Sequence, residues 1–224
     1  MKKFFEFGGV AAGIVLIAFG VAAIVLGVNG KNTVGTELKL QQIVGSADMT
    51  PAGIKAEAAQ AGLTNVTNWP TCSVANEAVT NGARARCFAE YMRIHALEAT
   101  HGVVYANMGR YEAKAGTPKS QLTADGATNN TDYAVIDPNS KQPVDNGARN
   151  LWVTETALTS ALNSAYMAEQ LGNFGIVVGI ALLLSGFGFV ILALGGALRA
   201  TGWVVKGFRS KQDPKPNTTA PLSA

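Results

Sequence analysis

The chain has 224 residues, of which 48% are hydrophobic and 15% are charged, and its formal net charge is +3. Soluble domains carry about 25% charged residues, so this composition predicts that part of the chain lies outside water. The small positive charge gives no ground for a nucleic-acid partner, which requires a basic patch on a folded surface.

Two uncharged apolar segments account for the excess of hydrophobic residues. They cover residues 7–28, FGGVAAGIVLIAFGVAAIVLGV, and residues 174–198, FGIVVGIALLLSGFGFVILALGGAL. A helix rises about 1.5 Å per residue and the hydrocarbon core of a bilayer is about 30 Å thick, so each segment is long enough to cross it. We therefore predict two transmembrane helices, with the lipid bilayer as their first partner.

The first segment has an alternative interpretation as a cleavable signal peptide, because Lys2 and Lys3 give it a basic start. Its apolar run is longer than the usual hydrophobic region of a signal peptide, which is about 7–15 residues. We therefore expect an uncleaved anchor.

Basic residues are distributed unevenly about these two segments. Lys2 and Lys3 precede the first, and residues 199–224 contain five basic residues and one acidic residue, whereas residues 29–173 contain eleven basic and thirteen acidic residues. Basic residues favour the cytoplasmic side, so we expect residues 1–6 and 199–224 in the cytoplasm and 29–173 outside an inner or plasma membrane of bacterial type. The polar, proline-rich end of the tail is expected to be disordered.

The only two cysteines, Cys72 and Cys87, both lie in the segment that we expect outside. An oxidising compartment makes a disulfide the default for such a pair. In the chain-entropy model, closing this loop would stabilise the domain by about 3 kcal/mol. The alternative is a pair of unbonded, buried thiols.

The segment between the spans is predicted to be helical, which makes the fold class all-α. Thr50 and Pro51 are typical of a helix start, and that helix should stop at Gly62. A second helix is predicted over residues 83–115, with an apolar stripe at steps of three and four formed by Phe88, Met92, Ala96, Ala99, Val103 and Ala106. Residues 116–147 are rich in turn sequences and predict an exposed, mobile loop. From Asn146 onward a third helix should run toward or into the second span, with Leu151, Leu158, Leu162 and Ala165 on one side.

Four stretches carry a resemblance to a known family: WPTCSVA (69–75), CFAEYMRIHALEAT (87–100), NGARNLWVTETALTSALN (146–163) and FGIVVGIALLLSGFGFVILALGGALR (174–199). They resemble a family of two-span actinobacterial membrane proteins, and the resemblance covers most of the chain except residues 116–145 and the tail. The family has no established activity, although its members are often automatically labelled aromatic ring-opening dioxygenases. The resemblance therefore implies a topology rather than a chemistry.

The dioxygenase label can be compared with the histidines of this chain. Non-haem iron oxygenases need two histidines and one carboxylate, and His95, Glu98 and His101 are the only residues that could supply them on one helix. The two histidines are six residues apart, almost two helical turns, so they cannot readily close on one ion. The simpler interpretation places His95 at the edge of the apolar stripe and His101 in solvent, with no bound metal or cofactor.

Glycines in the two spans suggest helix packing. Gly9 and Gly13 in the first span, and Gly175 and Gly179 in the second, form small-x-x-x-small pairs that permit close helix–helix approach. We expect the two spans to pair within one chain, with homo-oligomerisation as the alternative. Neither span contains an acid or a base, which argues against an ion or proton pathway.

Together these features predict a non-enzymatic integral membrane protein with an extracytoplasmic interaction or structural module. Such a protein would serve as a subunit or accessory factor of a cell-envelope assembly, bound to an unknown membrane or envelope protein. The alternative is a metal-dependent, ring-opening dioxygenase-like enzyme with a site at His95, Glu98 and His101.

Overall fold

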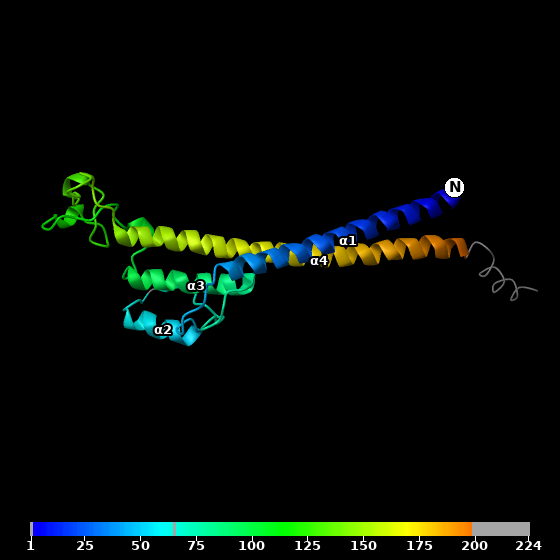
Figure 1. Cartoon of the computed structure of the whole chain (residues 1–224), viewed down its shortest axis with the longest axis horizontal. Coiled ribbons are helices and arrows are strands. Elements are labelled where there is room, and N and C mark those ends of the chain that lie inside the picture. Colours follow the sequence, from blue (N-terminus) through cyan, green and yellow to red (C-terminus); the bar gives the residue numbers. More distant parts are fainter. Residues whose placement is uncertain (1, 65, 199–224) are drawn as a thin grey trace, which may run out of the picture. The chain divides into compact units, whose positions relative to one another are not determined.

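The structure is a computed structural model that describes residues 2–64 and 66–198, so the predicted cytoplasmic tail, 199–224, lies outside the described residues. It contains four α-helices, α1 (Lys2–Leu40), α2 (Pro51–Gln60), α3 (Gly82–Ala99) and α4 (Gly147–Leu198) (Figure 1). Three short 3-10 helices, η1 (Tyr105–Asn107), η2 (Lys119–Gln121) and η3 (Thr131–Tyr133), lie between α3 and α4. Within the described residues β-structure is limited to isolated bridges, so the predicted helical class is confirmed.

The chain divides into two compact units. The first, here called the helix pair, comprises Met1–Gly27 and Phe174–Ala224, and the second, here called the helical module, comprises Val28–Asn173. Helices α1 and α4 are both long and apolar enough to cross a membrane, by length and composition. Only 11% of the most apolar window of each is buried, so neither resembles the core helix of a soluble protein.

In the helical module, α3 lies at the centre of the core. Tyr91 and Ile94 on α3 are fully enclosed, and Ile54 on α2, Leu38 on α1 and Leu162 on α4 pack into the same cluster. A second, smaller cluster contains Ala96, Leu97, Met108 and Trp152. All four α-helices therefore contribute apolar side chains to the larger cluster around α3.

Helix α2 begins and ends where the sequence predicts. The Thr50 hydroxyl accepts a hydrogen bond from the Gly53 amide at 3.0 Å, and Pro51 occupies the first turn. After the last turn, Gly62 adopts a φ of +73°, a conformation that side-chain-bearing residues rarely take. The N-cap and the glycine are local signals, which is why the sequence alone located this helix.

Helix α3 is shorter than predicted, because it ends at Ala99 rather than at residue 115. His101 and Gly102 have φ values of 50° and 78°, and the Gly102 amide donates to the Leu97 carbonyl at 2.7 Å, which closes the helix end. The expectation that Ala99 lies in the core is wrong, since Ala99 is exposed. Phe88 and Ala96 of the predicted stripe are buried, and Cys87, Tyr91 and Ile94 are buried beside them.

Helix α4 begins at Gly147 and continues without a break into the second apolar segment, as predicted. Of the predicted core-facing residues, Leu162 is buried, and Leu158 and Ala165 pack against the core while partly buried. Leu151 is exposed instead, and Trp152 beside it is buried. The Trp152 indole donates to the Val103 carbonyl at 3.0 Å and lies 3.2 Å from the Thr100 hydroxyl. Trp152 thereby fastens α4 to the segment that follows α3.

Residues 103–146 form a hydrogen-bonded lobe. The sequence predicted helix up to residue 115 and an exposed, mobile loop over residues 116–147. Isolated bridges join Tyr111 to Thr128 and Ala113 to Ala134. The Asp125 carboxylate accepts from the Thr123 hydroxyl at 2.6 Å and from the Asn146 side chain at 2.6 Å. Burial raises the pKa of Asp125, but these and two backbone hydrogen bonds outweigh it and hold the pKa below its ordinary value.

Candidate metal centre

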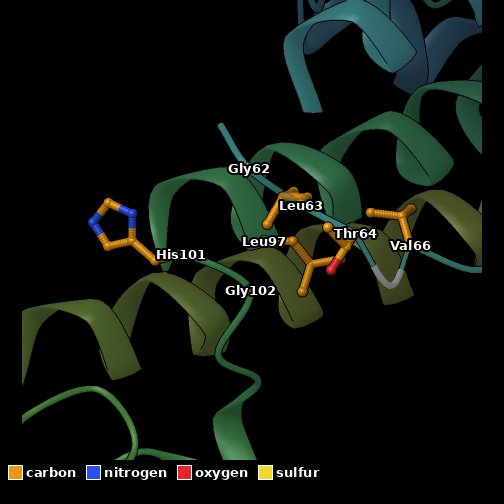
Figure 2. Close-up of a pocket in the computed structure, with 7 residues that line it drawn as sticks. All are labelled: Gly62, Leu63, Thr64, Val66, Leu97, His101 and Gly102. Atoms are coloured by element: carbon orange, nitrogen blue, oxygen red, sulfur yellow. The ribbon is translucent and has the colours of Figure 1, made fainter. Parts of the chain in front are cut away.

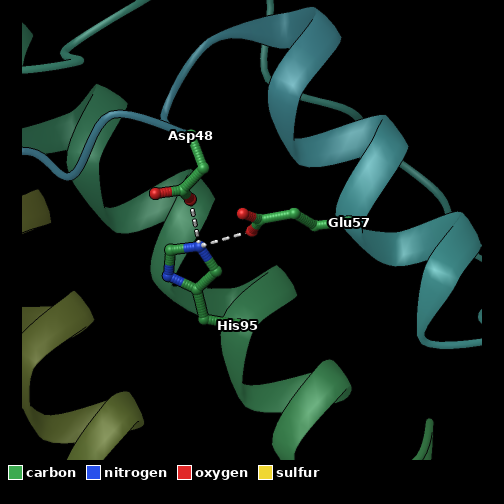
Figure 3. Close-up of side chains that lie close together, drawn as sticks. All are labelled: Asp48, Glu57 and His95. Carbon is green, nitrogen blue, oxygen red and sulfur yellow. Dashed lines mark hydrogen bonds and ion pairs between the residues drawn. The ribbon is translucent and has the colours of Figure 1, made fainter.

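Three side chains with metal-ligating atoms meet beside α3 in the helical module (Figure 3). Asp48 comes from the loop before α2, Glu57 from α2 and His95 from α3. The Nε2 atom of His95 lies 2.7 Å from the Asp48 Oδ2 atom and 3.9 Å from the Glu57 Oε2 atom. One ligand atom from each residue lies within 4.8 Å of the other two. The arrangement is therefore compact enough for all three groups to reach one ion.

Local structure explains why each side chain points to this place. The buried Met49 side chain and a hydrogen bond from the Val74 amide to the Met49 carbonyl, 3.1 Å, anchor the loop that carries Asp48. On α2, Ile54 and Ala58 face the core, and Glu57 precedes Ala58. On α3, His95 lies between the buried residues Ile94 and Ala96, at the border of the core.

Burial and charge differ among the three groups. The exposed fraction of the side chain is 18% for Asp48, 26% for His95 and 44% for Glu57, so the cluster is open to water on the Glu57 side. Burial raises the pKa of Asp48, but hydrogen bonds to Ser46 and His95 outweigh this effect and lower the pKa below its ordinary value. Asp48 is therefore ionised at neutral pH.

Glu98 lies one turn beyond His95 on α3 and belongs to the same electrostatic group. Burial raises its pKa, His95 lowers it, and repulsion from Glu57 and Asp48 raises it again, so that the pKa lies above its ordinary value. The Oε1 atom of Glu98 is buried and accepts no hydrogen bond from the described residues. A buried oxygen without a partner destabilises a fold by about 1–3 kcal/mol.

His95 and His101, which the sequence analysis grouped in one candidate site, lie in different surroundings in the structure. His101 follows the C-terminal end of α3, is exposed, and lies at a shallow pocket of about 190 Å³ with Leu63 and Leu97. Figure 2 shows its imidazole pointing away from those two leucines. His95 instead meets Asp48 and Glu57, which are distant in the sequence, so no local motif could have identified this group.

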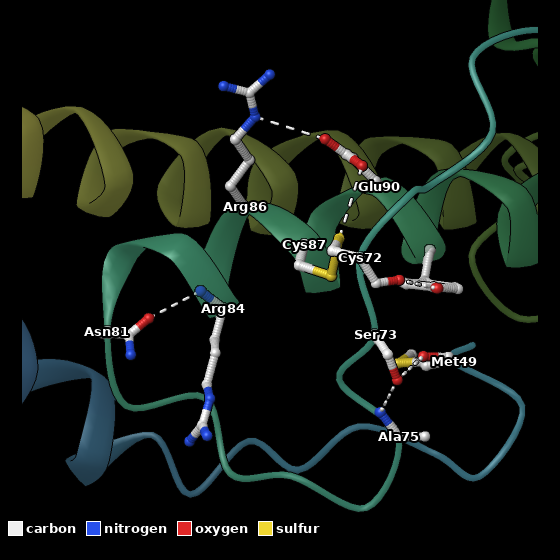
Figure 4. The surroundings of a disulfide bond; sticks show 10 residues. Met49, Cys72, Ser73, Ala75, Asn81, Arg84, Arg86, Cys87 and Glu90 are labelled. Atoms are coloured by element: carbon white, nitrogen blue, oxygen red, sulfur yellow. Dashed lines mark hydrogen bonds and ion pairs between the residues drawn. A yellow bond between two sulfur atoms is a disulfide. The ribbon is translucent and has the colours of Figure 1, made fainter. Parts of the chain in front are cut away.

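Cys72 and Cys87 lie at disulfide distance, with their sulfur atoms 2.05 Å apart, and the bond joins the preceding loop to the second turn of α3 (Figure 4). The Tyr91 hydroxyl donates to the Cys72 carbonyl, which holds the same loop against α3. At the start of α3, the Asn81 side chain accepts from the Arg84 amide at 2.9 Å. The disulfide therefore connects two segments that are also held by hydrogen bonds.

The helix pair packs through glycines, and the contacts run antiparallel. A Cβ atom on Gly13 would lie 2.7 Å from the Gly186 carbonyl oxygen, and one on Gly20 would lie 2.8 Å from the Gly179 carbonyl oxygen. Real Cβ atoms do not approach this closely, so the two backbones touch at these positions.

Among the glycines singled out from the sequence, Gly9 and Gly13 of α1 and Gly179 of α4 lie at close contacts, whereas a Cβ on Gly175 would meet nothing nearer than 3.4 Å. Gly20 and Gly186 are the contact residues that the four-residue motif missed. Gly13 and Gly20 are seven residues apart, as are Gly179 and Gly186, so the spacing that matters is one heptad. A search for glycines seven residues apart would have found them.

An apolar groove of about 570 Å³ lies between α3 and α4 in the helical module. Met92, Leu151 and Leu158 line it, and two ionisable side chains, His95 and Glu155, border it. His95 thus belongs both to the cluster that it forms with Asp48 and Glu57 and to the border of this groove.

No protein-family model, curated protein or solved structure matches this chain.

Proposed function

We propose that this chain is a non-enzymatic integral membrane protein that crosses the bilayer twice and carries residues 29–173 outside as an interaction or structural module. In this proposal it is a subunit or accessory factor of a cell-envelope assembly. Residues 7–28 and 174–198 would be the spans, and both termini would face the cytoplasm.

The observation that carries the proposal is the outward direction of large apolar side chains in the helix pair. Phe7, Leu26, Leu184 and Leu192 are all mainly exposed, while glycines occupy the helix–helix contact. Moving one such side chain from water into an apolar medium is favourable by about 1.5–3 kcal/mol. A lipid bilayer supplies that medium, and small residues at the contact are typical of packed membrane helices.

Charge and cysteine placement support the orientation. The basic residues before the first span and in residues 199–224 favour the cytoplasm for both ends. The disulfide between Cys72 and Cys87 fits an oxidising compartment for the module. The resemblance to two-span actinobacterial membrane proteins agrees with the same topology.

The apolar groove between α3 and α4 supports an interaction role for the module. Leu151 and Val153 remain exposed on α4 although they lie beside a well-packed core, and Leu151 lines the groove. Exposed apolar surface bordered by polar groups is typical of protein–protein contact sites. The partner we expect is an envelope protein that covers this groove.

Reporter insertion tests the topology. Gly116 is exposed, and nothing lies within 4 Å of the position that a Cβ atom would take there, so an insertion after it should leave the module folded. A reporter enzyme that works only outside the cytoplasm should be active after Gly116 and silent when fused after Ala224. The opposite pattern would contradict the proposed orientation.

Affinity purification from native membranes tests the interaction role. A protein that co-purifies with the wild type should be lost or reduced with Leu151→Arg, which places a charge in the groove, and retained with Lys119→Glu, a charge change on the exposed lobe. Equal recovery with both variants would exclude the groove as the contact.

A further inference from the structure

The side chains around His95 carry more negative than positive charge. Asp48 and Glu57 both face the imidazole, and Glu98 lies one turn along α3. Within the described residues, His95 is the only ion-pair partner that either Asp48 or Glu57 has. One imidazole balances at most one negative charge, so the cluster keeps an excess of negative charge beside the core.

Glu98 provides a second, independent observation. Its buried Oε1 atom has no hydrogen-bond donor among the described residues, in a structure whose other acids at this depth, such as Asp125, accept several hydrogen bonds. A buried carboxylate oxygen without a donor is unfavourable, and a cation bound close to it would stabilise it.

We propose that His95, Asp48 and Glu57 bind a divalent transition-metal cation of the Zn²⁺ class. The donor set identifies the class of metal. An imidazole nitrogen together with carboxylate oxygens suits Zn²⁺ and its neighbours, whereas Mg²⁺ and Ca²⁺ prefer oxygen ligands alone.

The distances require only small side-chain movements. Ligand atoms at about 2.1 Å from a tetrahedral ion lie about 3.4 Å from one another. The pair of His95 and Asp48, now at 2.7 Å, must open slightly, and the pair of His95 and Glu57, now at 3.9 Å, must close slightly. Glu57 is half exposed and can make that movement without disturbing the core.

Metal binding replaces the hydrogen bond between His95 and Asp48. The Nε2 lone pair must face the ion, so the neutral imidazole carries its proton on Nδ1, and a protonated imidazole releases one proton to solvent. Affinity should therefore fall as the solution is acidified. A bound ion would link the loop before α2, α2 and α3 at one point, and its binding to the folded state alone would raise the melting temperature.

Calorimetric titration of the full-length protein in detergent micelles with Zn²⁺, in the presence of excess Mg²⁺, tests the proposal. The wild type should bind one Zn²⁺ per chain, and both His95→Gln and Glu57→Gln should weaken binding about tenfold or more, since each removes a direct ligand. His101→Gln is the matched control, because it removes the other histidine of the chain, which lies outside the cluster, and it should bind Zn²⁺ like the wild type.

Glu57→Gln also shows whether weaker binding could result from misfolding. Because Glu57 is partly exposed, this variant should leave the circular dichroism and the melting temperature of the metal-free protein unchanged. Absence of stoichiometric binding by the wild type would overturn the proposal. Equal affinities for the wild type, His95→Gln and Glu57→Gln would also overturn it. Loss of binding in His101→Gln would also overturn it, because His101 lies outside the cluster.

Discussion

The helix pair and the helical module place their large and small side chains in opposite ways. In the helix pair, Gly13 and Gly20 touch the backbone of α4, while bulky residues such as Phe7 and Leu192 face outward. In the helical module, Tyr91 and Ile94 are enclosed. The two units of one chain therefore pack in different ways, through small residues in the helix pair and through large apolar residues in the helical module. Burial of large apolar groups drives association in water, whereas close backbone approach through small residues suits association in lipid.

The two units also differ in how their polar groups are satisfied. The helix pair relies on helical backbone hydrogen bonds, which is the arrangement that a membrane requires. The module uses side-chain caps, a disulfide and the lobe around Asp125. Variants in both units test this difference, and the greatest loss of stability is expected in the core of the module.

Replacement of Trp152 by alanine should have the largest effect on the module. The buried indole fills the smaller core cluster and donates hydrogen bonds, so Trp152→Ala should lower the free energy of unfolding by about 3–5 kcal/mol. The neighbouring Leu151→Ala should cost far less, because Leu151 is partly exposed. Thermal melting of both variants measures the difference, and a larger loss with Leu151→Ala would favour the face predicted from the sequence.

Removal of the disulfide should come next. The double substitution of Cys72→Ser with Cys87→Ser should destabilise the module by about 3 kcal/mol, because the reduced chain gains entropy when unfolded. Melting curves with and without reductant check this, since reductant should lower the melting temperature of the wild type and leave the double variant unchanged. A wild type insensitive to reductant under unfolding conditions would contradict the bond.

Glycine substitutions sharpen the comparison within the helix pair. Gly20→Ala should destabilise the pair by about 1–3 kcal/mol, because the new Cβ atom would overlap the Gly179 carbonyl oxygen. Gly8→Ala should be neutral or stabilising, since nothing lies within 4 Å of its Cβ position and alanine favours helix. Reversible unfolding in mixed micelles would measure the change in the free energy of unfolding for each variant. Equal changes for Gly20→Ala and Gly8→Ala would refute the contact between glycines spaced seven residues apart.

Glu98→Gln should give the smallest effect, and its sign depends on pH. The raised pKa of Glu98 means that the folded state holds the proton more tightly than the unfolded state, so ionisation at neutral pH destabilises the fold. In metal-free protein the variant should therefore be more stable than the wild type by about 1 kcal/mol at pH 7. The gain should shrink as the pH falls through the raised pKa toward the ordinary value of 4.5.

Melting temperatures at pH 7 and near pH 4.5, measured with chelator, test this prediction. Asp48→Asn is the opposite case, because the lowered pKa of Asp48 contributes stability above its ordinary value of 3.8 that is lost as the pH falls further. A gain for Glu98→Gln that did not change with pH would mean that ionisation of Glu98 is not its cause.

Features that depend on nearby residues could be predicted from the amino-acid sequence. The lengths of the two apolar segments, the start of α2 at Thr50 and Pro51, and the start of α4 after Asn146 all follow from periodicity, capping and composition. These signals act over a few residues, so no knowledge of the rest of the fold is needed to interpret them.

Contacts between residues far apart in the chain could not be predicted in this way, because they depend on how the helices pack. The end of α3 at Ala99, the burial of Trp152 in place of Leu151, and the contact of Gly20 with Gly179 depend on partners far along the chain. The meeting of His95 with Asp48 has the same cause, since α2 and its preceding loop must fold onto α3 before the carboxylate reaches the imidazole. Helical spacing predicts neighbours within three or four residues, and this cluster joins residues 47 positions apart.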